Sequence, residues 1–382
     1  MLRALRLAIA LCLGGMLLAG CAQSAPAHSS SSGTARPLLG VDVGWVVANS
    51  GQIIMTPQVA DHVAAAGAQL ARVEFRSSPF IAGACAFTAA ICSQETAVAT
   101  AQMYKTYDQV VANLTAKHIQ ILGLLDYTTL AGGQAAWTAN NAENGLGTGS
   151  NPYTEQFAQT AEQIMAHYQG KIHLWEIWNE PNAWTKSEGA TTYSGGSFMY
   201  PSNYAALLKE TYQAAVVQHH LPVTLISGGL FGQSIQGVYS RSGAGATYLS
   251  SVFSYWKKAG MTHFPLDAIG EHLYITQGSS VTTAQVQQYL NWVHQVAVGY
   301  GDPTLPTYIT EMGWKRGPVT PQLQASNLQV ALAAAHAESY VHGVIVFNLT
   351  GLGYGIYSSS FTPEPSLTVF QAAAKLWATG PA

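Results

Sequence analysis

The feature of this sequence that most constrains its fold is a regular alternation of short apolar segments with longer segments of helical periodicity. Apolar runs typical of buried strands begin near Leu38, Leu70, Ile119, Lys171, Pro222, Leu266, Pro306 and Gly343. Segments with apolar residues at helical spacing follow them at 56–68, 95–118, 152–168, 202–220, 247–259, 283–298, 321–340 and 365–378. Eight strand–helix units without a change in composition predict an α/β fold of a single domain, a (β/α)8 TIM barrel.

A doubly wound parallel sheet is the alternative fold for an alternating chain. Such a sheet would carry a Gly-rich phosphate loop after its first strand, and Val43-Gly44-Trp45-Val46 is not one. Prolines after a Thr or Asn, at Pro57, Pro152 and Pro321, mark the starts of three of the expected helices. The barrel is therefore the favoured architecture.

The first 37 residues predict export rather than folding. Residues 1–20 place Arg3 and Arg6 before an apolar run that is too short for a membrane span, as in a lipoprotein signal peptide. The stretch Leu18-Ala19-Gly20-Cys21 resembles a bacterial lipobox, which implies cleavage before Cys21 and lipidation of its thiol; an ordinary secretory signal is the alternative. Residues 21–37 are expected to be a flexible Ser/Ala/Pro tether and residues 38–382 the barrel. We expect an exported protein that touches the membrane only through its lipid anchor, on the extracellular face or in the periplasm.

Charge and cysteine content exclude several partners. The formal net charge is −3 and only 9% of residues are charged, which argues against a nucleic-acid partner and fits an uncharged substrate. Cys85 and Cys92 close a short loop and predict a disulfide in an oxidising compartment. Two thiolates with no His nearby supply too few ligands for structural zinc, so we expect no metal and no cofactor.

The stretch from Leu174 to Asn182 predicts a buried strand that delivers a carboxylic acid to its own C-terminal end. A run of large apolar residues suits a strand covered on both faces, and Pro181 ends it. Asn179 and Glu180 are adjacent, so in a regular strand their side chains would point to opposite faces. For both to face one site, the strand must break or bulge there.

The C-terminal ends of the expected strands are where a barrel places its chemistry. They offer Asp42 and Trp45, Arg72 and Glu74, Asp126 and Tyr127, Asn179 and Glu180, Ser227-Gly228-Gly229, Glu271-His272-Leu273-Tyr274, Thr310 to Trp314, and Phe347-Asn348. Glu180 and Glu311 form the pair with the clearest chemical use. Aromatic residues in the following loops, such as Trp184, are candidate platforms for a ligand ring or parts of loop packing.

Several of these residues resemble those of glycoside hydrolase clan A, and the closest likenesses are to its families 5 and 39. The resemblance rests on Trp178-Asn179-Glu180-Pro181, His272, Tyr274, Glu311, Trp314 and Arg72, and it spans the whole barrel. It implies a retaining mechanism in which Glu180 is the acid/base and Glu311 the nucleophile, with carboxyl groups about 5 to 5.5 Å apart. A carbohydrate would then be the substrate.

The resemblance also implies substrate-binding roles for neighbouring residues. Asn179 would bond the sugar 2-hydroxyl, Tyr274 would bond Glu311, and His272 would contact sugar or order the acid. Arg72 would keep the nucleophile ionised, or it would only neutralise buried carboxylates such as Glu74 and Glu176. Glu176 itself sits deeper and is expected to be structural.

The end of the last strand departs from the clan pattern. Clan members usually carry a tryptophan platform there, whereas this chain has Phe347-Asn348. Phe347 would supply a smaller apolar face, or Trp314 would substitute. Asn348 joins the substrate-binding candidates.

The sequence leaves three functions from different classes. The first is a retaining β-glycosidase acting on an extracellular β-glucan, mannan, xylan or exopolysaccharide. The second is a transglycosylase that remodels envelope glycan with the same residues. The third is a carbohydrate-binding lipoprotein without turnover, against which the intact Glu180 and Glu311 pair argues. We expect a monomer, and the choice between endo and exo action stays open.

Overall fold

The computed structural model describes residues 36–77, 80, 90–130, 137, 149–183, 197–231 and 244–379. They belong to one compact unit of the chain, Thr34–Ala382. Its strands are β1 (Leu38–Asp42), β2 (Leu70–Glu74), β3 (Gln120–Leu125), β4 (Leu174–Ile177), β5 (Thr224–Ser227), β6 (Leu230–Phe231), β7 (Ile269–Leu273), β8 (Thr307–Met312) and β9 (Val341–Val346). Its helices are α1 (Pro57–Ala65), α2 (Ala90–Thr115), α4 (Pro152–His167), α5 (Pro201–Tyr212), η2 (Gln213–Gln218), α6 (Ala244–Lys258), α7 (Thr283–Gly299), α8 (Pro321–His336) and α9 (Pro365–Thr379).

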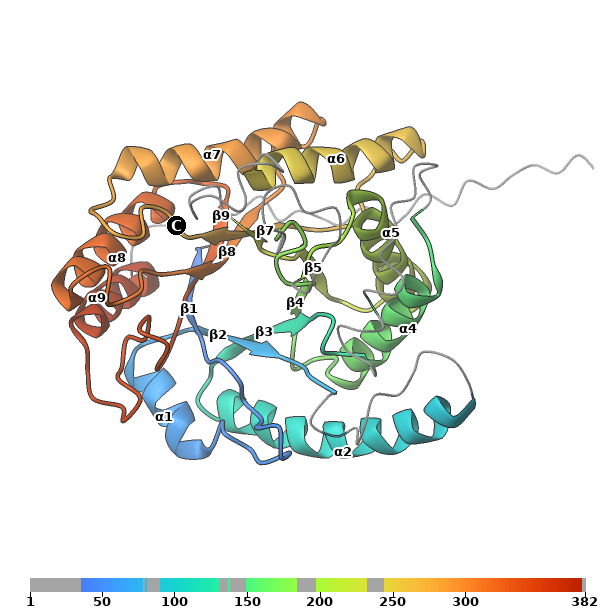
Figure 1. The fold of residues 1–382 in the computed structure, drawn as a ribbon, viewed down its shortest axis with the longest axis horizontal. Helices are drawn as coiled ribbons and strands as arrows, with labels where there is room; N and C mark the ends of the chain where they lie inside the picture. Colours follow the sequence, from blue (N-terminus) through green and yellow to red (C-terminus); the bar gives the residue numbers. More distant parts are fainter. Residues whose placement is uncertain are drawn as a thin grey trace, which may run out of the picture. The chain divides into compact units, whose positions relative to one another are not determined.

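The strands form one parallel sheet that closes into a barrel. Their order is β5-β4-β3-β2-β1-β9-β8-β7-β6. The two ends of this order meet where Ile226 of β5 bridges Ala268, the residue before β7, and the Ser227 amide donates to the Ala268 carbonyl over 3.0 Å. The helices lie outside the strands (Figure 1). The predicted (β/α)8 barrel is confirmed.

The helices begin where the sequence supplies caps. Thr56 and Thr320 accept hydrogen bonds from the first turns of α1 and α8, each with a proline at the start of the helix. Asn151 and Thr282 form reciprocal capping boxes with Thr154 of α4 and Gln285 of α7. Local chemistry therefore fixes where these helices start.

The barrel interior is filled by an apolar layer to which β1 to β5, β8 and β9 contribute, together with the residue before β7. It consists of Leu38, Leu70, Leu122, Leu174, Ile226, Ala268, Tyr308 and Ile345. Side chains alternate along a strand, so residues two and four positions further on face the same interior. These include Asp42, Arg72, Glu74 and Glu176. The polar residues thus stack on the apolar layer, at the C-terminal mouth of the barrel.

Three details differ from the sequence prediction. Gly228 and Gly229 interrupt the fifth strand, so its continuation forms a separate two-residue strand, β6, that pairs with β7. The helix expected at 202–220 passes into the π-helix η2, which no Pro or Gly in the sequence signals. Helix α2 begins at Ala90, five residues before the expected start at Glu95.

Some expectations fall where the structure gives no description. Cys21, Cys85 and Trp184 lie outside the described residues, and so does the side chain of Cys92. In the described part of the chain, no helix combines the length and apolar character that a bilayer crossing requires.

Candidate active site

The chain breaks sharply after β4, as the adjacent Asn179 and Glu180 require. Trp178 has φ 76° and Glu180 has φ 48°, both in the left-handed region that side chains other than glycine rarely adopt. The Trp178 ring packs against Phe157 on the helix side of the strand, and its indole N–H donates to the Ser197 carbonyl over 2.7 Å. Asn179 and Glu180 are thereby both turned toward the barrel mouth.

A β-bulge in β8 aims Glu311 into the site. Ile309 and Met312 pair with Val344 and Val346 of β9, so β8 carries one more residue than its neighbour over this stretch. The pairing of β8 with β7 is irregular at the same level. A bulge lets consecutive side chains face the same side. Thr310 accordingly bonds to buried Glu176 while Glu311 reaches the mouth.

Arg72 lies at the centre of a buried network and is only 4% exposed. Its Nε donates to Glu176 Oε2 over 2.6 Å, and its Nη1 donates to Asp42 Oδ2 over 3.0 Å and to Glu311 Oε1 over 2.5 Å. Its Nη2 donates to Asn179 Oδ1 over 2.8 Å. Arg72 therefore both neutralises deep carboxylates and contacts Glu311, so the two roles considered from the sequence coexist.

Glu311 is surrounded by donors. Besides Arg72, the Tyr274 hydroxyl donates to Glu311 Oε2 over 2.6 Å, the contact that the resemblance implies. Burial by itself would raise the pKa of Glu311, but the charges of His272 and Arg72 and the Tyr274 hydroxyl lower it below its usual value. The folded protein thus favours an ionised Glu311.

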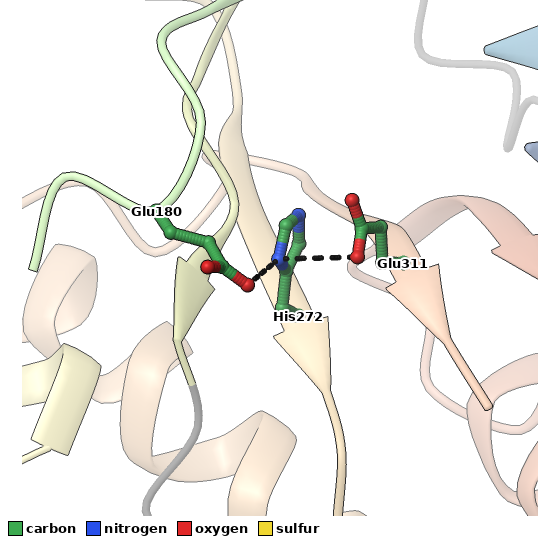
Figure 2. A group of neighbouring side chains, drawn as sticks. All are labelled: Glu180, His272 and Glu311. Carbon is green, nitrogen blue, oxygen red and sulfur yellow. Dashed lines mark hydrogen bonds and ion pairs between the residues drawn. The ribbon is translucent and has the colours of Figure 1, made fainter. Parts of the chain in front are cut away.

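Glu180 faces Glu311 across His272 (Figure 2). The His272 Nδ1 atom lies 2.9 Å from Glu180 Oε1 and 3.6 Å from Glu311 Oε2. One oxygen of each carboxyl group and one ring nitrogen of His272 all lie within 4.8 Å of one another. The nearest oxygens of the two carboxyl groups are therefore no further apart than this.

The two carboxyl groups have pKa values shifted in opposite directions. Burial raises the pKa of Glu180, an effect that its contact with His272 only partly offsets. Glu311, with Arg72 and Tyr274 as additional donors, is shifted downward. A pair of this kind can hold one proton on Glu180 and a negative charge on Glu311 over a range of pH.

Glu180, His272 and Glu311 also form a group with the spacing of metal ligands. Both oxygens of Glu311 already accept hydrogen bonds, from Arg72 and Tyr274. A cation at this place would have to compete with the Arg72 guanidinium group. The donors present suit a proton-handling carboxyl pair better than a metal centre.

A cavity of about 580 Å³ opens beside Glu311, over the ends of β9, β1, β2 and β3. This volume is typical of a small-molecule site. Its lining comprises Asp42, Val43, Gly44, Trp45, Ile54, Arg72, Glu74, Arg76, Leu124, Asp126, Tyr127, Thr128, Asn179, Glu311, Phe347, Asn348, Thr350 and Leu352. Another hollow, of about 800 Å³, lies between α6 and α7 and is lined by none of these strand-end residues.

The structure brings most of the predicted site residues together, with one correction. Arg72, Asn179, Phe347 and Asn348 line the cavity next to Glu311. Trp314 does not: it is 1% exposed, and its indole N–H donates to the Ile275 carbonyl over 2.8 Å. The expectation that Trp314 offers a platform to sugar is wrong, because the ring is a core residue.

Two contributors were missed from the sequence. Asp42 has no role in the sequence prediction, although it accepts a hydrogen bond from Arg72. Thr310 appears there only as part of a strand end, although its hydroxyl donates to Glu176 over 2.8 Å. The inward alternation of the first strand could have indicated Asp42, but the bulge that turns both Thr310 and Glu311 inward leaves no signal in the sequence.

No protein-family model and no curated protein matches this chain. Solved structures do match, and glycoside hydrolases are among them. A family 39 glycoside hydrolase from the gut symbiont Bacteroides cellulosilyticus WH2 superposes with a TM-score of 0.61 at 18% identity, over 89% of this chain and 64% of the other. This chain thus spans less than two thirds of that protein.

Two further structures are similar over more of their length. A GH5_18 protein from Streptomyces cattleya, solved with GlcNAc, has a TM-score of 0.64 and 14% identity over 91% of this chain and 82% of its own. The endoglucanase Cel5A from the hyperthermophilic Thermotoga maritima has a TM-score of 0.55 and 14% identity over 88% and 96%. The barrel is therefore of the kind that glycoside hydrolases of families 5 and 39 share.

Proposed function

We propose that this chain is a retaining β-glycosidase, with Glu180 as acid/base and Glu311 as nucleophile. The observation that carries the proposal is the approach of the two carboxyl groups to within 4.8 Å around His272. Retaining enzymes hold their carboxyl groups about 5 to 5.5 Å apart, whereas inverting enzymes leave about 6.5 to 9.5 Å for a water molecule. The spacing supports double displacement rather than a single displacement by water.

In the first step, a carboxylate oxygen of Glu311 attacks the anomeric carbon of the sugar. The bond from that carbon to the glycosidic oxygen breaks, and the proton of Glu180 passes to the departing oxygen. The products are a glycosyl ester on Glu311 and a free alcohol. An ionised Glu311 and a protonated Glu180 are the states that this step needs.

In the second step, Glu180 is a carboxylate and acts as the base. It takes a proton from a water molecule whose oxygen attacks the anomeric carbon, and the ester bond to Glu311 breaks. The sugar leaves with its original configuration. Both carboxyl groups return to their starting states, so one water is consumed for each bond cleaved.

Neighbouring residues would set up these states. Arg72 and Tyr274 each hold one oxygen of Glu311, which fixes the orientation of the carboxylate. His272 holds Glu180 through its Nδ1 atom. Asn179 accepts from Arg72 through Oδ1, which leaves its amide N–H groups to face a sugar hydroxyl at the cavity wall.

The setting and substrate are part of the same proposal. The signal-like residues 1–20 and the lipobox-like sequence ending at Cys21 support export and attachment to a membrane by lipid. The cavity wall carries both guanidinium and carboxyl groups, which supports an uncharged glycan as substrate.

The decisive experiment follows the anomer that is released first. Wild-type protein acting on an aryl β-glycoside should release the β-anomer, observed by NMR before mutarotation. Glu311→Ala should lose at least about 10⁴-fold in kcat, and azide should restore part of it with an α-glycosyl azide as product. The matched control is Glu162→Gln, a carboxyl group of helix α4 that should keep wild-type rates when it is replaced. Release of the α-anomer by wild type, or undiminished turnover by Glu311→Ala, would contradict the proposal.

A further inference from the structure

The cavity lies beside Glu311, over the ends of β1, β2 and β3. Among the described residues, Glu311 and Asn179 belong to its wall and Glu180 does not. Under the proposed mechanism the leaving group departs on the side of the acid Glu180. The cavity therefore lies under the part of the substrate that stays attached to Glu311, the non-reducing side of the scissile bond.

The far part of the cavity holds a second pair of carboxyl groups. Glu74 lies two residues beyond Arg72 on the inward face of β2, about 6.6 Å further toward the mouth. The hydroxyl oxygen of Thr128 is 2.8 Å from Glu74 Oε1 and 2.7 Å from Asp126 Oδ1. A hydroxyl has one proton and can donate to only one of them. The other contact requires a proton on the carboxyl oxygen, so the pair presents one acid and one carboxylate.

The protonated member is Glu74. Thr128 also donates its backbone N–H to Asp126 Oδ1 over 2.7 Å, a further contact that favours charge on Asp126. Burial and the nearby Asp126 raise the pKa of Glu74 to about 8. The proton of Glu74 is shared with Thr128, so the remaining oxygens of Glu74 and Asp126 can accept from ligand hydroxyl groups.

Asn348, which follows β9 and lines the same cavity, adds an independent sign that the cavity takes a ligand. It is 3% exposed, and its side-chain oxygen has no hydrogen-bond partner. A buried acceptor without a donor is costly. A ligand hydroxyl in the cavity would supply that donor.

The rim of the cavity carries an aromatic ring suited to a sugar. Trp45 is 53% exposed although it is a large apolar residue. The guanidinium carbon of Arg76 lies 4.2 Å from the centre of its ring, which holds the indole in place. A fixed, exposed indole at a cavity mouth can stack on the C–H face of a pyranose.

We propose that Glu74, Asp126, Thr128 and Trp45 form a binding site for a second, neutral sugar on the non-reducing side of the cleaved bond. The inference rests on the proposed function and names the substrate class: a glycan with at least two neutral sugars before the point of cleavage. A cationic sugar would meet Arg72 and Arg76, and an anionic one would meet Asp42 and Asp126, so neither is matched as well as a neutral one.

The test compares aryl β-glycosides with one and with two sugars before the aryl group. 4-Nitrophenyl glucoside and cellobioside, xyloside and xylobioside, and mannoside and mannobioside serve as paired probes. In Glu74→Ala and in Trp45→Ala, kcat/KM for the two-sugar probe should fall at least tenfold while that for the one-sugar probe stays within twofold. Glu74→Gln should lose less activity on the two-sugar probe than Glu74→Ala, because the amide keeps an uncharged acceptor oxygen at this place. Asp108→Asn, a carboxyl on the outer face of α2, is the matched control.

The outcomes separate this inference from the function it rests on. If one-sugar probes are cleaved but neither Glu74→Ala nor Trp45→Ala distinguishes the two lengths, the second sugar site is refuted and the glycosidase stands. Equal loss on both lengths refutes it as well. If no aryl glycoside is cleaved and none forms a glycosyl ester on Glu311, both proposals fail. Trp45 is exposed, so its variant keeps the test valid even if Glu74→Ala does not fold.

Discussion

The guanidinium group of Arg72 donates to a carboxylate oxygen of Glu311 over 2.5 Å, although two strands, β1 and β9, separate their strands around the barrel mouth. The same nitrogen also contacts Asp42, and the Nε atom of Arg72 contacts Glu176. One cation thus serves both the buried interior of the barrel and its open end. The stability of the barrel and the charge of Glu311 are linked through it.

Replacing Arg72 should disturb both the stability of the barrel and the charge of Glu311. Arg72→Lys keeps the charge but lacks the planar fork that reaches several acceptors at once. We expect kcat/KM on an aryl β-glycoside to fall about 10- to 100-fold, the effect of a lost charged hydrogen bond. The pKa of Glu311 should rise, so the acidic limb of the pH–rate profile should move to higher pH. An acidic limb at the wild-type position would show that Arg72 does not control the ionisation of Glu311.

The pH profile of the wild-type protein should be bell-shaped. Activity requires ionised Glu311, whose pKa is lowered, and protonated Glu180, whose pKa is raised by burial. Activity is therefore lost at low pH when Glu311 takes up a proton and at high pH when Glu180 loses one. Glu180→Gln, assayed on an aryl glycoside with a good leaving group, should keep the acidic limb and lack the alkaline one. A persisting alkaline limb would assign it to another group.

Tyr274→Phe isolates one contact of the nucleophile. The variant removes only the hydroxyl that donates to Glu311 Oε2, while the ring can stay in its buried place. We expect kcat to fall about 10- to 100-fold, as for loss of a hydrogen bond to a charged group, with little change in Tm. Steady-state kinetics and thermal unfolding measure the two effects. A large loss of Tm with unchanged kcat would make the hydroxyl structural.

Gly229→Ala tests the packing that positions His272. A Cβ atom at Gly229 would lie 2.0 Å from His272 Cδ2 and 2.6 Å from Thr310 Oγ1. The ring that holds Glu180 must then move. We expect destabilisation by about 1–3 kcal/mol and a loss of kcat, measured by urea unfolding and by kinetics. Gly278→Ala, whose added Cβ meets nothing within 4 Å, is the control. Equal behaviour of the two variants would refute the packing argument.

Glu74 should make stability depend on pH. Its pKa is raised from 4.5 to about 8, by burial first and then by Asp126, while Thr128, Arg76 and Arg72 oppose the shift. The uncharged form is favoured by folding, so its contribution is complete below about 4.5 and is lost as the pH rises through about 8. Glu74→Gln should therefore lose less Tm between pH 5 and pH 9 than wild type. The nearby Tyr107, whose pKa is raised further, stays uncharged throughout this range. Parallel curves for the two proteins would exclude Glu74 as the titrating group.

Much of the fold follows from the sequence because local signals agree with it. Apolar runs mark the strands, and Thr56, Asn151 and Thr320 mark helix starts with side-chain caps. The break after β4 could be predicted because Asn179 and Glu180 are adjacent and both polar. Features that depend on neighbouring strands could not be predicted. The short strand β6 needs β7 beside it, and nothing along the chain indicates that partner.

In the site, too, local features could be predicted from the sequence and contacts between distant strands could not. Strand alternation indicates which residues face inward, and so finds Arg72 as a candidate. Glu311 is found from its place at a strand end and from the resemblance to clan A, because regular alternation would turn it outward. Alternation does not tell which acceptors Arg72 reaches, because those come from strands far apart in sequence. The resemblance to clan A also misplaces Trp314, whose ring packs in the core and whose indole N–H donates to the Ile275 carbonyl. The pairing of Glu74 with Asp126 through Thr128 likewise appears only when β2 and the end of β3 lie side by side.

The extra residue in β8 has an evolutionary consequence. Loss of the Glu311 codon, in the stretch between Ile309 and Met312, would restore a regular strand in which Thr310 still faces inward and the proposed nucleophile is gone. The apolar layer below would be untouched, and the ligand cavity would keep most of its wall. A lectin-like descendant could therefore arise from this barrel by a single deletion, without passing through an unfolded ancestor.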